Sequence, residues 1–208
     1  MALNTYKTLT DSILAWSKRT EFDGTILADL VKLTETKINN SDLRLTSEED
    51  TYRVTLETND NYVALPPRYK SIRSIRIKYS NSRKHLMYVT PARLMYVDQP
   101  GFPKSYTIAN TIEFDRKPDQ KYEVFVDYHQ LLNPLDSADP DSTNNILDKY
   151  PAIYLYGALE EVFNYILDEK RAAGYRMKFY QMISNANQLE ETGRFPTDAA
   201  PTPPGGIV

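Results

Sequence analysis

The chain has 208 residues, of which 41% are hydrophobic and 25% are charged, so it has the composition of a folded globular protein and not of a disordered one. Its 25 Lys and Arg residues against 28 Asp and Glu residues give a net charge of -3, which argues against a general nucleic-acid coat protein. The absence of Cys excludes disulfides, thiolate metal sites and Cys nucleophiles. No stretch has the pattern of a signal peptide or the roughly 20 apolar residues of a membrane helix, so we expect a protein made in a cytoplasm.

Two helices are predicted first. Apolar residues recur at steps of three and four over residues 5–18 and again over 23–40, which is the spacing of one helix face. Asp23 is suited to cap the second helix, and the short link between the two predicts an antiparallel pair. The predicted buried residues are Tyr6, Leu9, Ile13 and Trp16 in the first helix and Ile26, Leu30, Leu33 and Ile38 in the second.

Strands follow the helices. Alternating polar and apolar residues and turn residues predict strands at 51–57, 62–65, 71–79, 85–89, 105–108, 111–114 and 121–129. A tight hairpin is predicted at Ala109-Asn110. The clearest alternation places Tyr122, Val124, Val126 and Tyr128 on one face of the last strand and Glu123, Phe125, Asp127 and His129 on the other.

Helices return after a loop at 131–145. One is predicted from Pro151 to residue 170 and another from Tyr175 to Gly193, with Gly174 as the bend or break between them. The predicted fold class is α+β: a helical bundle from N- and C-terminal helices with a central antiparallel β-rich insertion. The predicted domain is residues 1–191 (helices 5–40 and 151–191, β insertion 51–130), followed by an extended C-terminal arm at 192–208.

Catalytic and metal-binding motifs are missing from the sequence. The glycines match neither a Rossmann fingerprint nor a P-loop, and His85 and His129 have no metal-ligand spacing, so His129 is read as structural. The calcium-loop pattern fails after Asp139, so the aspartates of the 131–145 loop are read as turn caps. Glu160 and Glu161 are acid–base candidates only in principle. We therefore expect no cofactor, no metal and no enzymatic activity.

Charge is distributed unevenly along the chain. Residues 61–97 contain eight basic and no acidic residues, whereas residues 131–170 carry a net charge of -6. The basic stretch is open to three interpretations: a phosphate-facing surface, a face that meets the acidic face of the next copy, or an ordinary solvated strand face. The candidate DNA-channel or subunit-interface residues are Arg68, Lys70, Arg73, Arg76, Lys78, Arg83 and Lys84.

The C-terminal residues and the tyrosines also suggest interfaces. The tail is rich in Pro and Gly, which suits either a disordered end or an extended docking arm with Phe195, Ile207 and Val208 as apolar anchors. The 16 Tyr residues are typical of protein interfaces but also of ordinary strands.

Five sequence blocks in a fixed order resemble the phage adaptor proteins, which are head-to-tail connectors or tail accessory factors of short-tailed phages. The resemblance covers about residues 4–190. It rests on the opening helix at 5–18, on LTETKINNSDLRL at 33–45, YVALPPRYKSIRSIRI at 62–77, GFPKSYTIANTIEFDRKPDQKYEVFVDYHQLLNPLD at 101–136 and STNNILDKYPAIYLYGALEEVFNYILDE at 142–169.

That resemblance implies a structural virion protein at the head-to-tail junction. It implies a closed ring of about twelve identical copies, which needs a heterologous interface between two different patches of each copy. The implied partners are the chain itself, the portal protein, tail or nozzle proteins, and packaged DNA passing through the channel, with no membrane. The alternatives are a nucleic-acid-binding module that uses the basic 68–93 stretch and a cell-wall hydrolase.

Overall fold

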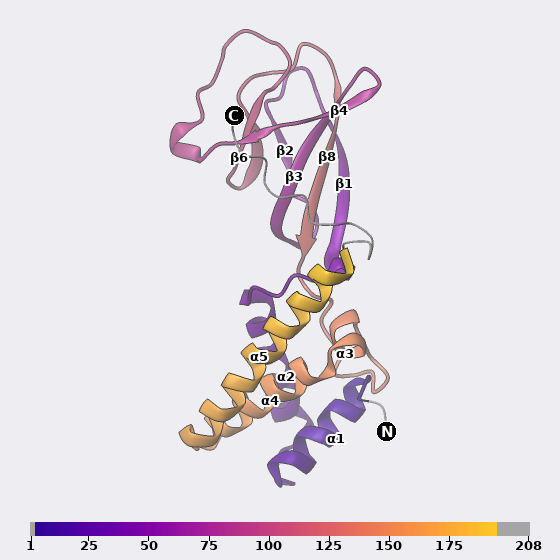
Figure 1. The fold of residues 1–208 in the computed structure, drawn as a ribbon, viewed down its shortest axis with the longest axis vertical. Coiled ribbons are helices and arrows are strands. Elements are labelled where there is room, and N and C mark those ends of the chain that lie inside the picture. The colour runs from indigo at the N-terminus through magenta and orange to yellow at the C-terminus, as the bar shows by residue number, and fades with distance from the viewer. Residues whose placement is uncertain (1–2, 195–208) are drawn as a thin grey trace. The chain divides into compact units, whose positions relative to one another are not determined.

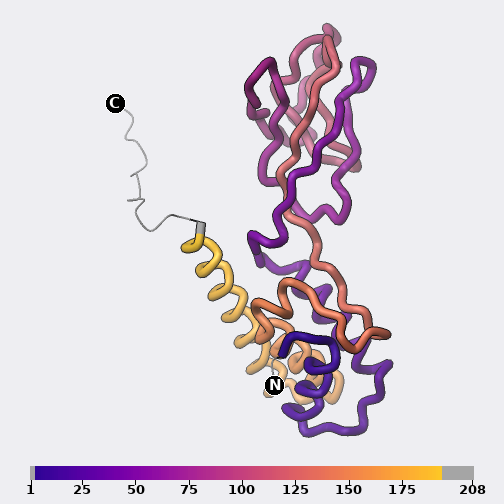
Figure 2. The backbone as a smooth tube through the Cα atoms, turned by 90° about the vertical axis from the view of Figure 1, so that its right-hand side faces the viewer, coloured from indigo at the N-terminus to yellow at the C-terminus, as the bar shows by residue number. Residues whose placement is uncertain are grey.

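The computed structural model describes residues 3–194 of the chain, which fall into two compact units. The helical unit combines the residues up to Ser47 with those from Leu132 onward, and the β unit spans Glu48–Leu131. In Figure 2 the indigo and the orange-to-yellow parts of the tube therefore lie in one unit, and the purple-to-salmon part forms the other. The predicted α+β class is confirmed.

The helical unit contains five helices within the described residues (Figure 1). The predicted cap of α2 is confirmed, because Asp23 Oδ1 accepts a hydrogen bond of 2.8 Å from the backbone N–H of Ile26. Thr5 caps α1 through a reciprocal pair of hydrogen bonds with Thr8. The helices are α1 (Tyr6–Ser17), α2 (Gly24–Asn40), α3 (Asn145–Lys149), α4 (Pro151–Tyr165) and α5 (Glu169–Arg194).

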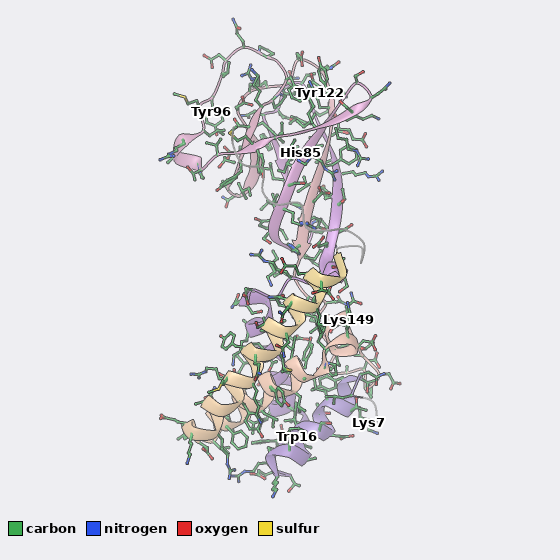
Figure 3. All side chains as sticks on the ribbon, in the orientation of Figure 1. Lys7, Trp16, His85, Tyr96, Tyr122 and Lys149 are labelled. Atoms are coloured by element: carbon green, nitrogen blue, oxygen red, sulfur yellow. The ribbon has the colours of Figure 1, made fainter. Side chains whose placement is uncertain are left out.

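One hydrophobic core joins the helices from the two ends of the chain. Leu9 and Ile13 of α1, Tyr154 and Leu159 of α4, and Phe179 of α5 are fully buried in it. Two of the predicted core positions are wrong. Trp16 and Leu33 are each about half exposed, and Trp16 lies on the surface of α1 in Figure 3. The buried face of α2 is rotated from the predicted one and includes Leu27, Val31, Thr34 and Glu35.

The break between the last two helices is not at Gly174, as predicted, but seven residues earlier. Leu167 has the left-handed backbone conformation (φ 59°) that ends α4, and the backbone N–H of Asp168 donates to the carbonyl of Phe163. Asp168 then caps α5, its Oδ1 accepting a hydrogen bond of 3.1 Å from the N–H of Arg171. Gly174 lies inside α5 as an ordinary exposed helical residue.

A short helix, α3, begins at the last residue of the predicted loop and lies in a segment to which the sequence analysis assigned no element. The side-chain oxygen of Asn144 accepts hydrogen bonds from the backbone N–H groups of Ile146 and Leu147, which starts α3 at Asn145. Pro and Asp residues before it fit the predicted loop, but the apolar pair Ile146 and Leu147 is buried and holds this single turn in place.

The β unit contains two four-stranded sheets. The first has the strand order β1-β8-β3-β4 and is antiparallel, with β8 in the middle of the pairing between β1 and β3. The second has the order β2-β7-β6-β5. The strands are β1 (Glu49–Leu56), β2 (Tyr62–Ala64), β3 (Tyr69–Tyr79), β4 (Ser82–His85), β5 (Met87–Tyr88), β6 (Ser105–Ile108), β7 (Thr111–Phe114) and β8 (Tyr122–Gln130).

Two features of the sheets differ from the prediction. The predicted strand 85–89 is divided by the buried Leu86, so that β4 pairs with β3 in one sheet and β5 pairs with β6 in the other. The β5–β6 pair is parallel, which breaks the expected purely antiparallel pattern. The predicted hairpin at Ala109-Asn110 is confirmed, because β6 and β7 pair antiparallel around it.

The inner faces of the two sheets share a core of their own. It contains Val124 and Val126 of β8, Ile77 of β3, and Ile112 and Phe114 of β7, all of them fully buried. The predicted grouping of Tyr122, Val124, Val126 and Tyr128 on one face of the last strand is confirmed, and this is the face that lies in the core. The opposite face of the first sheet carries polar and charged side chains.

Candidate interaction surface

Charged side chains from neighbouring strands lie close together on the polar face of the β1-β8-β3-β4 sheet. Alternation along β8 puts Glu123, Phe125 and Asp127 on this face. The sheet register places Arg53 of β1 and Arg76 of β3 on either side of Phe125. Cross-strand neighbours of this kind have side chains in direct reach of one another, so the face is a connected array of charges.

Asp127 organises one half of this array. It accepts hydrogen bonds from Thr51 (2.8 Å), Ser74 (2.6 Å) and Arg76 (2.7 Å), which come from the two strands flanking β8. Burial alone would raise the pKa of Asp127, but these hydrogen bonds outweigh burial and hold the pKa below its ordinary value. A pocket of about 490 Å³ lies beside this carboxylate, and His85 of β4 lines it (Figure 3).

A second pocket, of about 350 Å³, lies over the ring of Phe125. The guanidinium carbon of Arg83 lies 3.9 Å from the ring centroid and that of Arg53 lies 5.6 Å from it. Phe125 is thereby only 2% exposed, although it is on the outer face of the sheet. Lys78 also lines the pocket and forms a 3.5 Å ion pair with Glu123. The pocket therefore presents three cations and one carboxylate around an aromatic floor.

The predicted basic residues do not share one surface. Arg73 pairs with Glu49 and Arg76 with Asp127, so both are partly neutralised within the sheet. Lys84 lies against the Tyr79 ring, at 4.0 Å from its centroid, and close to Phe102, whose ring packs on the inner core.

Of the remaining predicted basic residues, one bonds to the backbone and two line a pocket. The guanidinium of Arg68 donates to the carbonyl of Leu131. Lys70 is half-buried on β3, and only Lys78 and Arg83 line the pocket over Phe125.

Arg53 belongs to the site but was not among the predicted residues. It lies outside the acid-free stretch that drew attention to its neighbours. The strand alternation over 51–57 places Arg53 outward, which is a usable signal. Its position opposite Phe125 depends on the β1–β8 register, which the sequence of one strand does not reveal.

Large apolar side chains are exposed on the same unit. They lie mainly on β5 and the segment after it, which includes Tyr96, whose hydroxyl bonds to Glu113 (Figure 3). Exposed apolar residues that form a contiguous patch often mark an interaction site. The group consists of Met87, Tyr88, Met95, Tyr96 and Val97.

Part of the acidic region at residues 131–170 forms ion pairs inside the helical unit. Glu160 is 2% exposed and pairs with Lys37 at 2.8 Å and with Arg176 at 2.7 Å. Glu161 pairs with the same Lys37. These two glutamates tie α4 to α2 and α5, which gives them a structural role in place of the acid–base role considered from sequence.

The exposed aspartates of the region lie on a loop whose ends are held firmly. As predicted, two of them cap turns: Asp136 accepts from the N–H of Ala138 at 2.9 Å, and Asp139 accepts from the N–H of Asp141 at 3.0 Å. The carbonyls of Pro140 and Ser142 accept hydrogen bonds from the first residues of α1. The loop is therefore anchored to the helix end and presents its carboxylates to solvent.

A buried polar cluster holds the beginning of this loop. Glu35 Oε1 accepts hydrogen bonds from the N–H of Leu135 (2.7 Å) and the hydroxyl of Tyr154 (3.1 Å). The amide of Asn144 donates to the Tyr154 oxygen at 2.6 Å. Burial raises the pKa of Glu35, and these hydrogen bonds offset only part of that increase. Sequence analysis missed this cluster, because Glu35 and Asn144 are far apart in the chain.

His129 is buried, with its Nε2 4.0 Å from Glu49 Oε1, in keeping with the structural role predicted for it. Within residues 3–194 no three His or acidic side chains gather as a metal site would require. No described helix combines the length and apolar character needed to cross a membrane. The predicted arm residues Phe195, Ile207 and Val208 lie outside the described residues.

Comparison with known proteins identifies the family. A search of curated proteins found no match. The family model described as SU10 adaptor protein, which represents phage head-to-tail adaptors, matches residues 4–201. The match covers both units and nearly the whole sequence, and it agrees with the resemblance seen in the five sequence blocks. The chain therefore belongs to the SU10 adaptor protein family and is a structural adaptor of phage particles.

Proposed function

We propose that this adaptor forms a closed ring at the junction between the phage head and tail. In this proposal about twelve copies assemble beneath the portal, retain the packaged DNA and provide the platform on which tail or nozzle proteins attach. Family membership over residues 4–201 carries the proposal. Such a protein acts in the virion and needs no catalytic residue.

The surfaces of the two units support an assembly role. A ring of identical copies requires two different patches on each copy that fit one another. The β unit has a pocketed, basic sheet face and a group of exposed apolar residues, and the helical unit has an exposed acidic loop. In the proposed ring the helices at 5–18, 23–40 and 151–170 pack as a bundle and form the wall.

Two further elements of the proposal concern docking. The basic residues between Arg68 and Lys84 face either the DNA channel or a neighbouring copy. The arm at 192–208 docks on the portal or on an adjacent copy through Phe195, Ile207 and Val208. Because a channel must release the genome at ejection, scattered basic residues suit it better than a continuous basic stripe.

The test is the mass of the purified protein in solution, alone and mixed with the portal protein of the same phage, by light scattering after size exclusion. We expect a stoichiometric, ring-sized complex with portal. A truncated protein that ends at residue 191 serves as the comparison. It should stay folded but bind portal more weakly than the full-length protein. A full-length protein that ignores portal at all concentrations would contradict the proposal.

Nucleic-acid binding has less support from the sheet. Arg73 and Arg76 are already paired with carboxylates, and Glu123 lies in the pocket with Arg53 and Arg83. A DNA-binding module should lose affinity steeply as salt rises, because it releases counterions from phosphates. Duplex binding that is weak at low salt would exclude this alternative.

A further inference from the structure

Arg53 and Arg83 form an anion-binding arrangement that is occupied by no carboxylate of the described chain. Both guanidinium groups lie within cation–π distance of the Phe125 ring, Arg83 at 3.9 Å and Arg53 at 5.6 Å from its centroid. Among the described residues neither of them forms an ion pair, whereas Arg73 and Arg76 nearby both do. Both side chains are exposed and line a pocket of about 350 Å³.

Two such groups suit a carboxylate. A guanidinium offers a planar pair of N–H donors that matches the two oxygens of a carboxylate, and stacking on an aromatic ring reduces the entropy lost on binding. Lys78 adds a third positive charge, although Glu123 at 3.5 Å offsets it. With three cations and one carboxylate the pocket has a net charge of about +2, which favours the entry of carboxylates.

The acidic loop of the helical unit supplies carboxylates in a suitable form. Asp136, Asp139 and Asp141 are exposed within six residues of each other. Hydrogen bonds from the start of α1 and from the Glu35 cluster fix the backbone on both sides of them. A preorganised loop of this kind binds with a smaller loss of conformational entropy than a flexible one.

We propose that the pocket formed by Arg53, Arg83 and Phe125 in one copy receives the carboxylates of the loop around Asp141 in the next copy. This inference rests on the proposed ring, and it assigns the basic face to the contact between copies. The pocket and the loop are different patches of one chain, so repeated contacts between them would connect copies head to tail.

The same charges argue against a DNA phosphate as the occupant. Glu123 lines the pocket, and the carboxylate of Asp127 lies on the same sheet face. A duplex would bring a row of phosphates across the face and meet these carboxylates as well as the arginines. An acidic side chain in the pocket over Phe125 lies beside Glu123 but outside the pocket that Asp127 lines, so it meets less of this repulsion.

Charge reversal tests the inference. The variant with Arg53→Glu and Arg83→Glu, and separately the variant Asp141→Arg, should each weaken assembly of the ring-sized complex with portal at least tenfold. Combining the three substitutions in one chain should restore a large part of the assembly, because every contact then joins reversed partners. Arg93→Glu and Asp11→Arg, which reverse exposed charges elsewhere, should leave assembly unchanged.

The outcomes separate this inference from the proposed function. If the wild type assembles and the double-arginine variant assembles equally well, the pocket is not the contact, although the ring proposal stands. If the wild type never assembles with portal, the ring proposal itself fails. If the arginine variant instead loses affinity for duplex DNA with no effect on assembly, the occupant is phosphate and the inference is overturned.

A milder variant guards against misfolding. Arg53→Lys with Arg83→Lys keeps both charges but lacks the planar pair of donors, so assembly should fall less than on charge reversal. Thermal unfolding by circular dichroism should show the same fold for all variants. Equal assembly of the lysine variant and the wild type would contradict the bidentate geometry.

Discussion

At the scale of single residues, Gly157 occupies a tightly packed position in the helical unit. A Cβ atom there would lie 2.7 Å from the Thr34 side chain of α2 and 3.2 Å from the Phe179 ring of α5. Both neighbours are fully buried, so neither can move aside easily. The absence of a side chain at this position lets α4 approach two helices at once.

The substitution Gly157→Ala should therefore destabilise the protein by about 1–3 kcal/mol through overpacking, even though Ala is the better helix former. Gly174→Ala is the matched control, because nothing lies within 4 Å of a Cβ at that position. It should stabilise the protein by about 0.5–1 kcal/mol. Urea unfolding measures both, and equal effects of the two substitutions would contradict the close packing at Gly157.

Glu190 is a largely buried carboxylate whose ionisation contributes to stability. It is 7% exposed on α5 and accepts hydrogen bonds from Lys149 (Figure 3), from Tyr150 at 2.8 Å and from the N–H of Thr46 at 3.0 Å. Burial would raise its pKa, but these partners outweigh it and lower the pKa to about 2. The carboxylate therefore links α5 to Thr46 in the first chain segment of the helical unit and to Lys149 and Tyr150 in the second.

This lowered pKa predicts a loss of stability in acid. The folded pKa is below the unfolded one, so the contribution is complete above about pH 5 and disappears as the pH falls toward 2. At pH 7 Glu190→Gln should cost on the order of 2–3 kcal/mol. The difference from wild type should shrink on going to pH 3 in urea unfolding, while Glu191→Gln, on the exposed side, should have little effect at either pH. A cost that is independent of pH would contradict this account.

At the scale of elements, the connection between α4 and α5 is built from an unfavourable residue. Leu167 is 86% exposed, so its side chain gains little from burial. Its φ is positive, which is a strained backbone conformation for a residue with a Cβ atom. Leu167→Gly should raise the free energy of unfolding by about 0.5–1 kcal/mol. Ile166→Gly, at a φ of -91° and partly buried, should lower it. Thermal unfolding distinguishes these results, and destabilisation by Leu167→Gly would show that the leucine packs usefully.

The elements also show what the sequence could and could not predict. The spacing of apolar and turn residues located the bounds of α1, α2, β6 and β7 closely. The same reasoning did not predict the end of α4 at Leu167. A leucine is not a residue type that usually ends a helix, whereas Gly174 is, so the break was predicted at Gly174. Periodicity also failed at Trp16 and Leu33, where the choice between neighbouring faces depends on packing partners.

The candidate site was predicted only in part, for a related reason. The acid-free stretch drew attention to Lys78 and Arg83, which line the pocket over Phe125. It could not show that Lys84 lies against Tyr79, or that Arg53 joins the pocket from another strand. Charge counts along a sequence carry no information on which strands become neighbours.

At the scale of the whole molecule, each unit has a hydrophobic core of its own. A fragment of residues 48–131 should therefore fold alone, with cooperative thermal unfolding and dispersed amide signals in NMR spectra. Phe114→Ala in that fragment should remove about 3–5 kcal/mol, because Phe114 is fully buried. A fragment without cooperative unfolding would show that the β unit depends on the helical residues.

The interrupted layout of the helical unit sets the order in which a nascent chain can fold during translation. The β unit is continuous in sequence, and its pairing of Glu49 with His129 brings its two ends together. Its folding would bring residues 47 and 132 close to each other before α4 leaves the ribosome, which reduces the entropy cost of closing that long loop. Before α4 has been synthesised, the apolar faces of α1 and α2 lack the helix against which they pack. If translation stalls at that point, these faces stay exposed and can bind chaperones.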